Sequence, residues 1–131
     1  MSHREAFDRA CEALCGDEGW HWAGDAIEVP TDEERHQRVS IEFFEFEDEE
    51  LVRLYTVIGS SDRIHPLKLT QALRLNFGLP HGALGLRGDD LVMIDTLMVE
   101  GADAEEIAAS VEYLAETGDH FEEKLFGSDE N

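Results

Sequence analysis

The C-terminal quarter of the chain carries the pattern that most constrains its fold. Apolar or small residues recur there at spacings of three and four, at Ala104, Ile107, Val111, Leu114, Gly118, Phe121 and Leu125. This periodicity predicts one amphipathic helix of about six turns, with Asp103 as its N-cap and Gly127 as its end. Gly118 lies on the apolar stripe. Because glycine costs about 1 kcal/mol relative to alanine in a helix interior, we expect Gly118 to allow a close contact.

Two shorter helices are predicted nearer the N-terminus. Ser2 and Glu5 form a capping-box pattern, which predicts a helix over 3–15 with Gly16 as its stop. The second helix has Pro66 near its first position, where the missing N–H costs nothing. Its main apolar stripe consists of Leu69, Ala72 and Leu73.

Short apolar or alternating runs predict the strands, over 26–29, 38–46, 51–58, 83–87 and 91–98. The resulting order of elements is α-β-β-β-α-β-β-α. Strands that follow one another in antiparallel groups, rather than alternating with helices, indicate an α+β fold in which an antiparallel sheet packs against helices. The length suits a single domain, which we place at 1–127, with a short tail at 128–131.

Charge dominates the composition: 31 acidic residues against 10 basic ones give a net charge of −21. The acidic residues are spread over the chain, as in proteins adapted to a salty cytoplasm, but they would also suit a site for basic peptides. Nucleic acid is not expected as a partner, because phosphate binding needs basic patches. With no membrane-spanning stretch and no signal peptide in evidence, we expect a cytoplasmic protein that does not bind membranes.

Cys11 and Cys15 are the only cysteines and are four residues apart on a predicted helix. A disulfide between adjacent helical turns has poor geometry, and free cysteines usually behave as small buried hydrophobic residues. The alternative is a metal-sensing or small-molecule-sensing region that combines the cysteines with Trp20, His21 and Trp22. No fourth metal ligand is recognisable, so we expect no metal and no cofactor.

Motifs of enzyme chemistry are missing from the sequence. The glycines between 78 and 88 match no phosphate-binding loop, and there is no G-x-S-x-G nucleophile turn. The six histidines are dispersed, and no nucleophile, base and orienting residue can be grouped. We therefore expect a protein without catalytic residues.

Surplus apolar residues predict self-association. Leu67 and Leu75 lie off the main stripe of the second helix, and the run 91–99 is apolar on both faces. Such a surplus often marks an interface, and a twofold contact would let each copy cover the other. We place the contact of a homodimer at Leu67, Leu75, Met93 and Leu97. In the alternative, the first and last helices cover these residues within one chain.

The second half of the chain also resembles a known fold. Its segments LN (75–76), GALGLR (82–87), LVMIDTL (91–97), ADAEE (102–106) and GDHFE (118–122) resemble the YbjN family of bacterial proteins and, more broadly, the type III secretion chaperone-like fold. RVSIE (38–42) and VIG (57–59) extend this resemblance, which covers about 36–126. The resemblance implies a small non-enzymatic protein, often a homodimer. Secretion chaperones of this fold hold unfolded segments of their clients along apolar surface grooves.

We therefore expect a chaperone-like or regulatory protein that binds a polypeptide client. In the strand 38–46, Val39, Ile41 and Phe43 share one face, while Phe44 and Phe46 lie on the other unless a bulge resets the register. The residues most suited to contact a client are the exposed or paired aromatic ones: Trp20, Trp22, Phe44, Phe46 and Tyr55.

Overall fold

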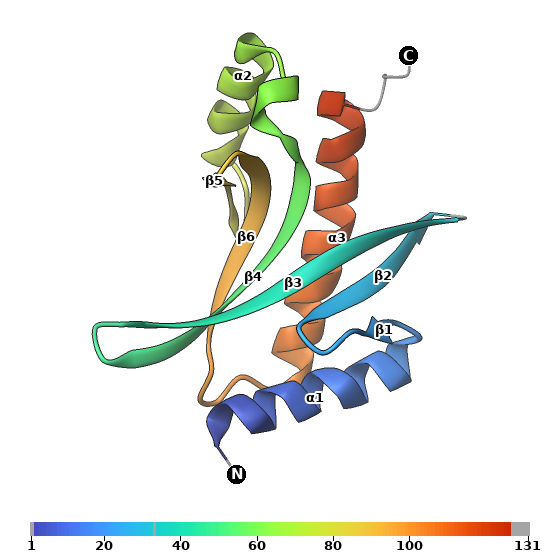
Figure 1. Ribbon diagram of the computed structural model, residues 1–131, viewed down its shortest axis with the longest axis vertical. Coiled ribbons are helices and arrows are strands. Elements are labelled where there is room, and N and C mark those ends of the chain that lie inside the picture. The colour runs from blue at the N-terminus through green and yellow to red at the C-terminus, as the bar shows by residue number, and fades with distance from the viewer. Residues whose placement is uncertain (1, 33, 127–131) are drawn as a thin grey trace.

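The computed structural model of the protein describes residues 2–32 and 34–126. The elements are α1 (His3–Glu18), β1 (His21–Trp22), β2 (Ala26–Asp32), β3 (Arg35–Phe46), β4 (Glu49–Ser60), a short 3-10 turn (Ser61–Arg63), α2 (Pro66–Asn76), β5 (Ala83–Arg87), β6 (Asp90–Met98) and α3 (Ala104–Phe126) (Figure 1). The predicted elements are all present. The addition is the two-residue strand β1, which was too short to give an alternating pattern.

All six described strands form one antiparallel sheet in the order β1-β2-β3-β4-β6-β5. β3 and β4 form the long central hairpin, and β6 rather than β5 lies beside β4. The hairpin turns at Glu47 and Asp48, which both have positive φ values of 51° and 68°. Two such residues match the right-handed twist of the strands that they join. The α+β class and the antiparallel sheet predicted from the sequence are confirmed.

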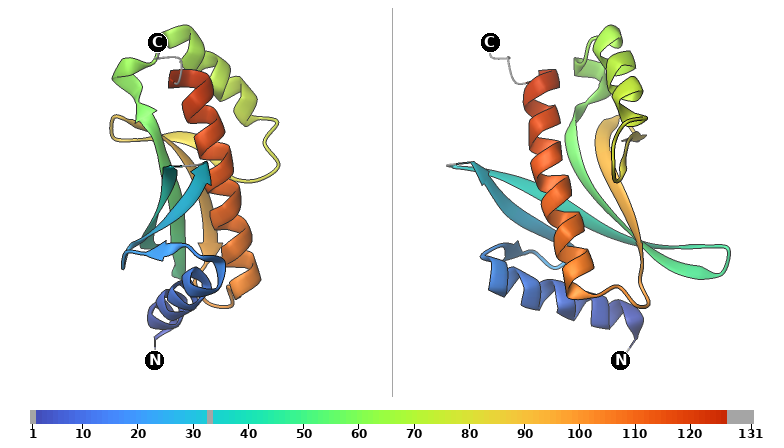
Figure 2. Two further views of the ribbon diagram at one scale, coloured as in Figure 1. Left: turned by 90° about the vertical axis from the view of Figure 1, so that its right-hand side faces the viewer. Right: turned by 180° about the vertical axis from the view of Figure 1, so that it is seen from behind.

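One face of this sheet packs against α3. Seen from behind, α3 crosses the sheet diagonally and contacts β2, β3, β4 and β6 (Figure 2). The strands supply alternating residues to this face, among them Val39 on β3 and Leu54 on β4, which are both fully buried. The α3 stripe meets them with Ile107, Val111, Leu114 and Ala115, none of which is exposed. The register of β3 with β4 is continuous from Ser40 to Phe46, so no bulge separates Phe43 from Phe44.

α1 crosses the lower end of the sheet in the view of Figure 1, against β1 and α3. The predicted capping box is present: the Ser2 hydroxyl accepts from Glu5 N–H, and the Glu5 carboxylate accepts from Ser2 N–H. The predicted end of this helix at Gly16 is wrong. The helix continues to Glu18, because the left-handed conformation that ends it is adopted by Gly19, with φ 78°, and not by Gly16.

β2 and β3 are longer than predicted, because Pro30 does not end β2. It pairs with His36 at the outer end of the strand, where the register then shifts before Asp32. A proline is tolerated where a strand ends or bulges. The predicted tail at 128–131 and the predicted helix stop at Gly127 lie outside the described residues. Within the described part of the chain, no helix combines the length and the apolar composition needed to cross a bilayer.

α2 lies at the other end of the molecule, beside β5 and the last turns of α3. Only Ala72 of this helix is buried. The predicted stripe is therefore partly wrong: Leu69 is half-buried, but Leu73 is 54% exposed. The reason is that α2 contacts the rest of the fold along a narrow line instead of a full helical face.

Candidate functional site

The second face of the sheet carries no helix over β3, β4 and β6 within the described residues (Figure 2). We call it the open face. Its residues alternate with the buried ones: Glu42 pairs with Arg53, and Tyr55 pairs with Ile94. Most of these side chains are half-buried by their neighbours on the sheet and not by a helix. The open face is thus the largest part of the sheet that is left for contact with another molecule.

Two arginines and one carboxylate form the centre of the open face. The Glu42 carboxylate accepts hydrogen bonds from Arg53, at 2.8 Å, and from Arg87, at 3.0 Å. Each guanidinium also lies over an aromatic ring. Arg53 Cζ is 4.0 Å from the ring centre of Phe44, and Arg87 Cζ is 4.9 Å from that of Tyr55. The five residues form one continuous network, which we call the open-face cluster.

The cluster fixes the protonation of its carboxylate. Hydrogen bonds from Arg87 and then from Arg53 hold the pKa of Glu42 below its ordinary value, against a smaller effect of desolvation. The hydrogen bond with Glu42 raises the pKa of Arg87. Glu42 therefore stays ionised at neutral pH and holds both guanidinium groups over their rings. The planar guanidinium groups are thus held in fixed orientations. A partner that contacts them therefore causes a smaller loss of side-chain entropy than it would at a freely rotating arginine.

Beside the cluster, the open face is hollowed into a depression of about 300 Å³. Its lining is partly polar and partly apolar, and consists of Glu42, Arg53, Tyr55, Leu86, Arg87, Val92 and Ile94. Such a mixture of apolar floor and fixed hydrogen-bonding groups suits binding. The lining contains no serine, cysteine or histidine that could act as nucleophile or base.

A second depression, of about 290 Å³, lies on the other side of β6, against α3. Here the Ser110 hydroxyl donates to Asp95 Oδ2 at 2.7 Å, which gives the carboxylate in the middle of this apolar strand a hydrogen-bond partner. His81 lines the same depression but packs edge-on against Tyr113, with ring centres 5.5 Å apart. Ser110 and Asp95 are therefore hydrogen-bonded to each other, but among the described residues no imidazole is hydrogen-bonded to either of them. We interpret the pair as a contact that joins α3 to β6 and not as catalytic residues.

The structure separates the aromatic residues predicted to contact a client. Phe44 and Tyr55 come together in the open-face cluster, and Phe46 is 61% exposed near the tip of the hairpin. Trp20 and Trp22 instead pack, half-buried, against the hydrophobic core beside α1. Glu42, Arg53 and Arg87 were not predicted as site residues. Arg53 is two residues before Tyr55 on one strand, and this spacing would have indicated a shared face. The position of Arg87 depends on the order of β6 and β5 in the sheet.

The residues of the sensing alternative are mostly part of the core or packed against it. Cys11 and Cys15 have free thiols and are buried, at 0% and 2% exposure, as small core residues. Burial raises the pKa of the Cys11 thiol to about 12, with smaller effects of Asp8 and Cys15. His21 is exposed on β1. Within residues 2–32 and 34–126, no three His, Cys, Asp or Glu side chains gather in a way that could hold a metal ion.

The predicted homodimer surface is not one surface. Met93 is fully buried in the core, on the face of β6 that packs towards α3, so its placement at an interface is wrong. Leu97 is half-buried in the depression beside α3. Leu67 and Leu75, both on α2, are 68% and 42% exposed. Homodimerisation itself remains a prediction.

Comparisons with known proteins give one informative result. Neither a protein-family model nor a curated protein matches the sequence. Among solved structures, a chain of the HopA1–SchA chaperone–effector complex is similar, with a TM-score of 0.51 and 11% sequence identity. The similarity covers 87% of this chain and 94% of that one. At such low identity it concerns the fold alone, and the fold is the type III secretion chaperone-like α+β fold that the sequence predicted.

Proposed function

We propose that the protein is a non-enzymatic, chaperone-like protein that holds an extended segment of a polypeptide client on its open face. The observation that carries this proposal is the open-face cluster, in which two arginines fixed by Glu42 lie over Phe44 and Tyr55. The fold shared with a chain of a chaperone–effector complex supports the same function. The sequence resemblance points in this direction as well.

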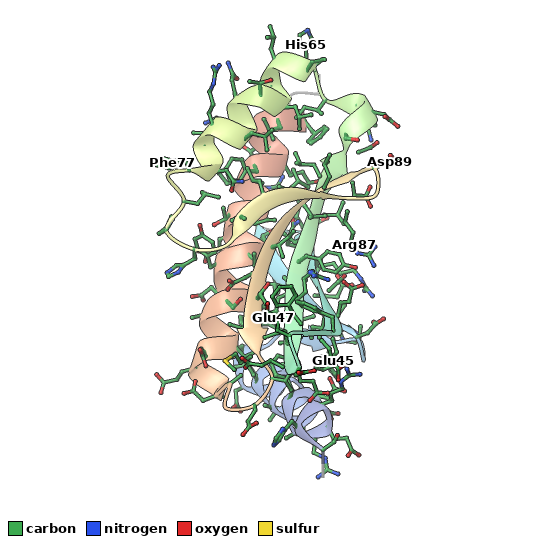
Figure 3. The ribbon with its side chains drawn as sticks, turned by 90° about the vertical axis from the view of Figure 1, so that its left-hand side faces the viewer. Glu45, Glu47, His65, Phe77, Arg87 and Asp89 are labelled. Atoms are coloured by element: carbon green, nitrogen blue, oxygen red, sulfur yellow. The ribbon has the colours of Figure 1, made fainter. Side chains whose placement is uncertain are left out.

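The surface chemistry defines the client. The apolar floor of the depression, with Leu86 and Ile94, would take the apolar side chains of one side of an extended peptide. Exposed carboxylates lie on the same strands and on the turns that join them. In Figure 3, Asp89 lies above Arg87 and Glu45 below it, and the hairpin tip adds Glu47. Basic residues that flank the apolar segment of a client would meet these acids.

A synthetic peptide tests this function directly. The probe is a fluorescein-labelled 15-residue peptide in which valine and leucine alternate with serine and two lysines flank each end. We expect Phe44→Ser and Tyr55→Ser each to weaken its binding about tenfold, or 1.4 kcal/mol, because buried aromatic anchors dominate such interfaces. Leu67→Ser, which removes an exposed apolar side chain from α2, is the matched control and should bind as the wild type does. Equal binding by all four proteins, or no binding, would refute the proposal.

We also propose a relationship to the YbjN family and a cytoplasmic location. The support for the relationship is the sequence: the similar segments lie on or beside α2, β3, β4, β5, β6 and α3. The support for the location is the absence of a membrane-spanning stretch from the sequence. An experimental structure of a YbjN-family protein with a different strand order would contradict the relationship. Cell fractionation with an antibody against this chain tests the location, and recovery outside the cytoplasmic fraction would contradict it.

A further inference from the structure

The acidic residues of this chain avoid one continuous stretch. Between residues 63 and 88 there is no aspartate or glutamate, so all 31 acidic residues lie elsewhere. The same stretch contains Arg63, Lys68, Arg74 and Arg87, which are four of the 10 basic residues. At its centre is α2. In a protein of net charge −21, this end of the molecule is therefore locally basic.

The basic residues around α2 also lack ionic partners. Within the described residues, Arg63, Lys68 and Arg74 form no ion pair, and neither does Lys124 at the end of α3. Outside the stretch most arginines pair with carboxylates, namely Arg4, Arg35, Arg38 and Arg53, and within it Arg87 pairs with Glu42 of the open-face cluster. Of the five basic residues without an ion pair in the described part of the chain, four therefore lie on or next to α2 or at the end of α3, and the fifth is Arg9.

Apolar surface and a groove accompany these cations. Between α2 and α3 runs a groove of about 310 Å³, whose mostly apolar lining consists of Gln71, Ala72, Arg74, Leu75, Lys124 and Leu125. Gln71 and Leu75 line the groove, and Leu67, one turn earlier, lies on the same side of α2. Past the end of α2, Phe77 is 98% exposed. Figure 3 shows α2 between His65 and Phe77, with several side chains that point away from the fold.

We infer that this α2 face is a docking site for an acidic, apolar segment of another protein. Apolar side chains of the segment would fill the groove beside Leu75, and its carboxylates would pair with Arg74 and Lys124. This partner is distinct from the basic-flanked client proposed for the open face. Charge complementarity decides between occupants: a twofold contact of α2 with a second copy would set unpaired cations against the same unpaired cations. A membrane surface could neutralise the cations but could not enter the concave groove.

The probe for this site is an 18-residue peptide labelled with fluorescein. It carries leucines at helical spacing of three and four, with glutamate and alanine at the other positions. We expect it to bind in 0.15 M KCl, measured by fluorescence anisotropy. The double variant Arg74→Glu/Lys124→Glu and the single variant Leu75→Ser should each weaken binding at least tenfold. Arg9→Glu, which reverses an exposed arginine on α1 that also has no ion pair, is the matched control and should leave binding unchanged. Circular dichroism melting confirms that each variant is folded.

Four results would overturn the inference. The first is failure of the glutamate peptide to bind the wild-type protein. The second is equal binding of a peptide with lysine in place of glutamate, or an equal loss in Arg9→Glu. The third is a mass by light scattering of twice 14.8 kDa that falls to 14.8 kDa in Leu67→Glu, since a second copy would then cover this face. The fourth is co-sedimentation with phosphatidylserine vesicles that Arg74→Glu/Lys124→Glu abolishes. Tyr55→Ser should not change binding of the glutamate peptide, so failure at the open face is recognised separately.

Discussion

Gly118 on α3 lies against Thr56 on β4 so closely that a Cβ atom at position 118 would be 2.5 Å from Thr56 Cγ2. The threonine methyl cannot move aside cheaply. Its hydroxyl donates to Arg38 O at 2.7 Å and accepts from Gln37 Nε2 at 2.7 Å, and both bonds fix the side-chain rotamer. The close contact expected at Gly118 from the sequence is thus confirmed, and the contact joins the long helix to the centre of the sheet.

Gly118→Ala should therefore destabilise the protein, although alanine favours helix by about 1 kcal/mol. The cost of overpacking is about 1–3 kcal/mol, so we expect a net loss of about 1 kcal/mol in the free energy of unfolding. Urea denaturation followed by circular dichroism measures it. Adding Thr56→Ser keeps the hydroxyl, removes the methyl group and should abolish the effect of Gly118→Ala. Gly16→Ala is the control: no atom lies within 4 Å of its Cβ position, and it should be neutral or stabilising. A stabilised Gly118→Ala would contradict the contact.

The sequence predicted an element correctly where the spacing of apolar residues within that element reflects which side chains are buried. On α3 and on β4 only one face is buried. The apolar stripe of α3 and the alternation of Val52, Leu54 and Thr56 therefore indicate the buried faces correctly. On β6 the alternation fails, because Val92 and Met93 are both fully buried between two neighbouring strands. The sequence pattern of such a strand does not distinguish a residue at an interface from a residue in the core. For this reason Met93 was wrongly predicted to lie at a dimer interface.

The candidate site was predictable only in part for a similar reason. Phe44 and Tyr55 lie on strands joined by one hairpin, so their common face follows from the sequence. Arg87 reaches Glu42 from 45 residues away. That contact requires β6 to lie between β4 and β5, and no local pattern specifies this strand order. The exposure of Leu73 likewise depends on how α2 packs against β5 and α3 and not on its own periodicity.

The two thiols should be inert in the folded protein. Both are buried, and burial raises the pKa of Cys11 to about 12 and also raises that of Cys15. Because the thiolate is the reactive form, Ellman's reagent at pH 8 should label both cysteines only as fast as the protein unfolds. Fast labelling of either thiol without denaturant would contradict their burial.

The same raised pKa predicts a loss of stability at alkaline pH. The unfolded Cys11 thiol ionises near its ordinary value of 9.0, whereas the folded thiol stays neutral up to about 12. The contribution of Cys11 to stability is therefore complete below pH 9 and is lost as the pH rises between these values. Thermal melting of Cys11→Ala between pH 8 and pH 10.5 should show a shallower decline than the wild type. Parallel declines in the two proteins would mean that Cys11 does not cause the loss.

Acid should destabilise the protein partly through Glu42. Arg87 and Arg53 lower the folded-state pKa of Glu42 from an ordinary value of 4.5, so its stabilising effect is present above that pH and is lost as the pH falls below it. We expect Glu42→Gln to be less stable than the wild type at pH 7 and to lose less stability between pH 6 and pH 3. Glu45→Gln, at an exposed carboxylate on the same strand, is the matched control. If the two variants show the same pH dependence, the cluster does not hold Glu42 ionised.

Salt should stabilise this protein, because its surface charges repel one another. With a net charge of −21, the compact state brings like charges closer than the unfolded chain does. In 1 M KCl the Debye length falls to about 3 Å, which removes most of this repulsion. Salt also weakens the exposed ion pairs of the arginines, but each such pair contributes at most about 1 kcal/mol. We expect the melting temperature to rise by at least about 5 °C between 0.02 M and 1 M KCl.

A triple variant that replaces Glu45, Glu47 and Glu49 with glutamine removes three exposed charges from the hairpin. It should melt higher than the wild type at low salt and respond less to KCl. A melting temperature that stays flat in both proteins would show that self-repulsion does not limit the stability of this fold.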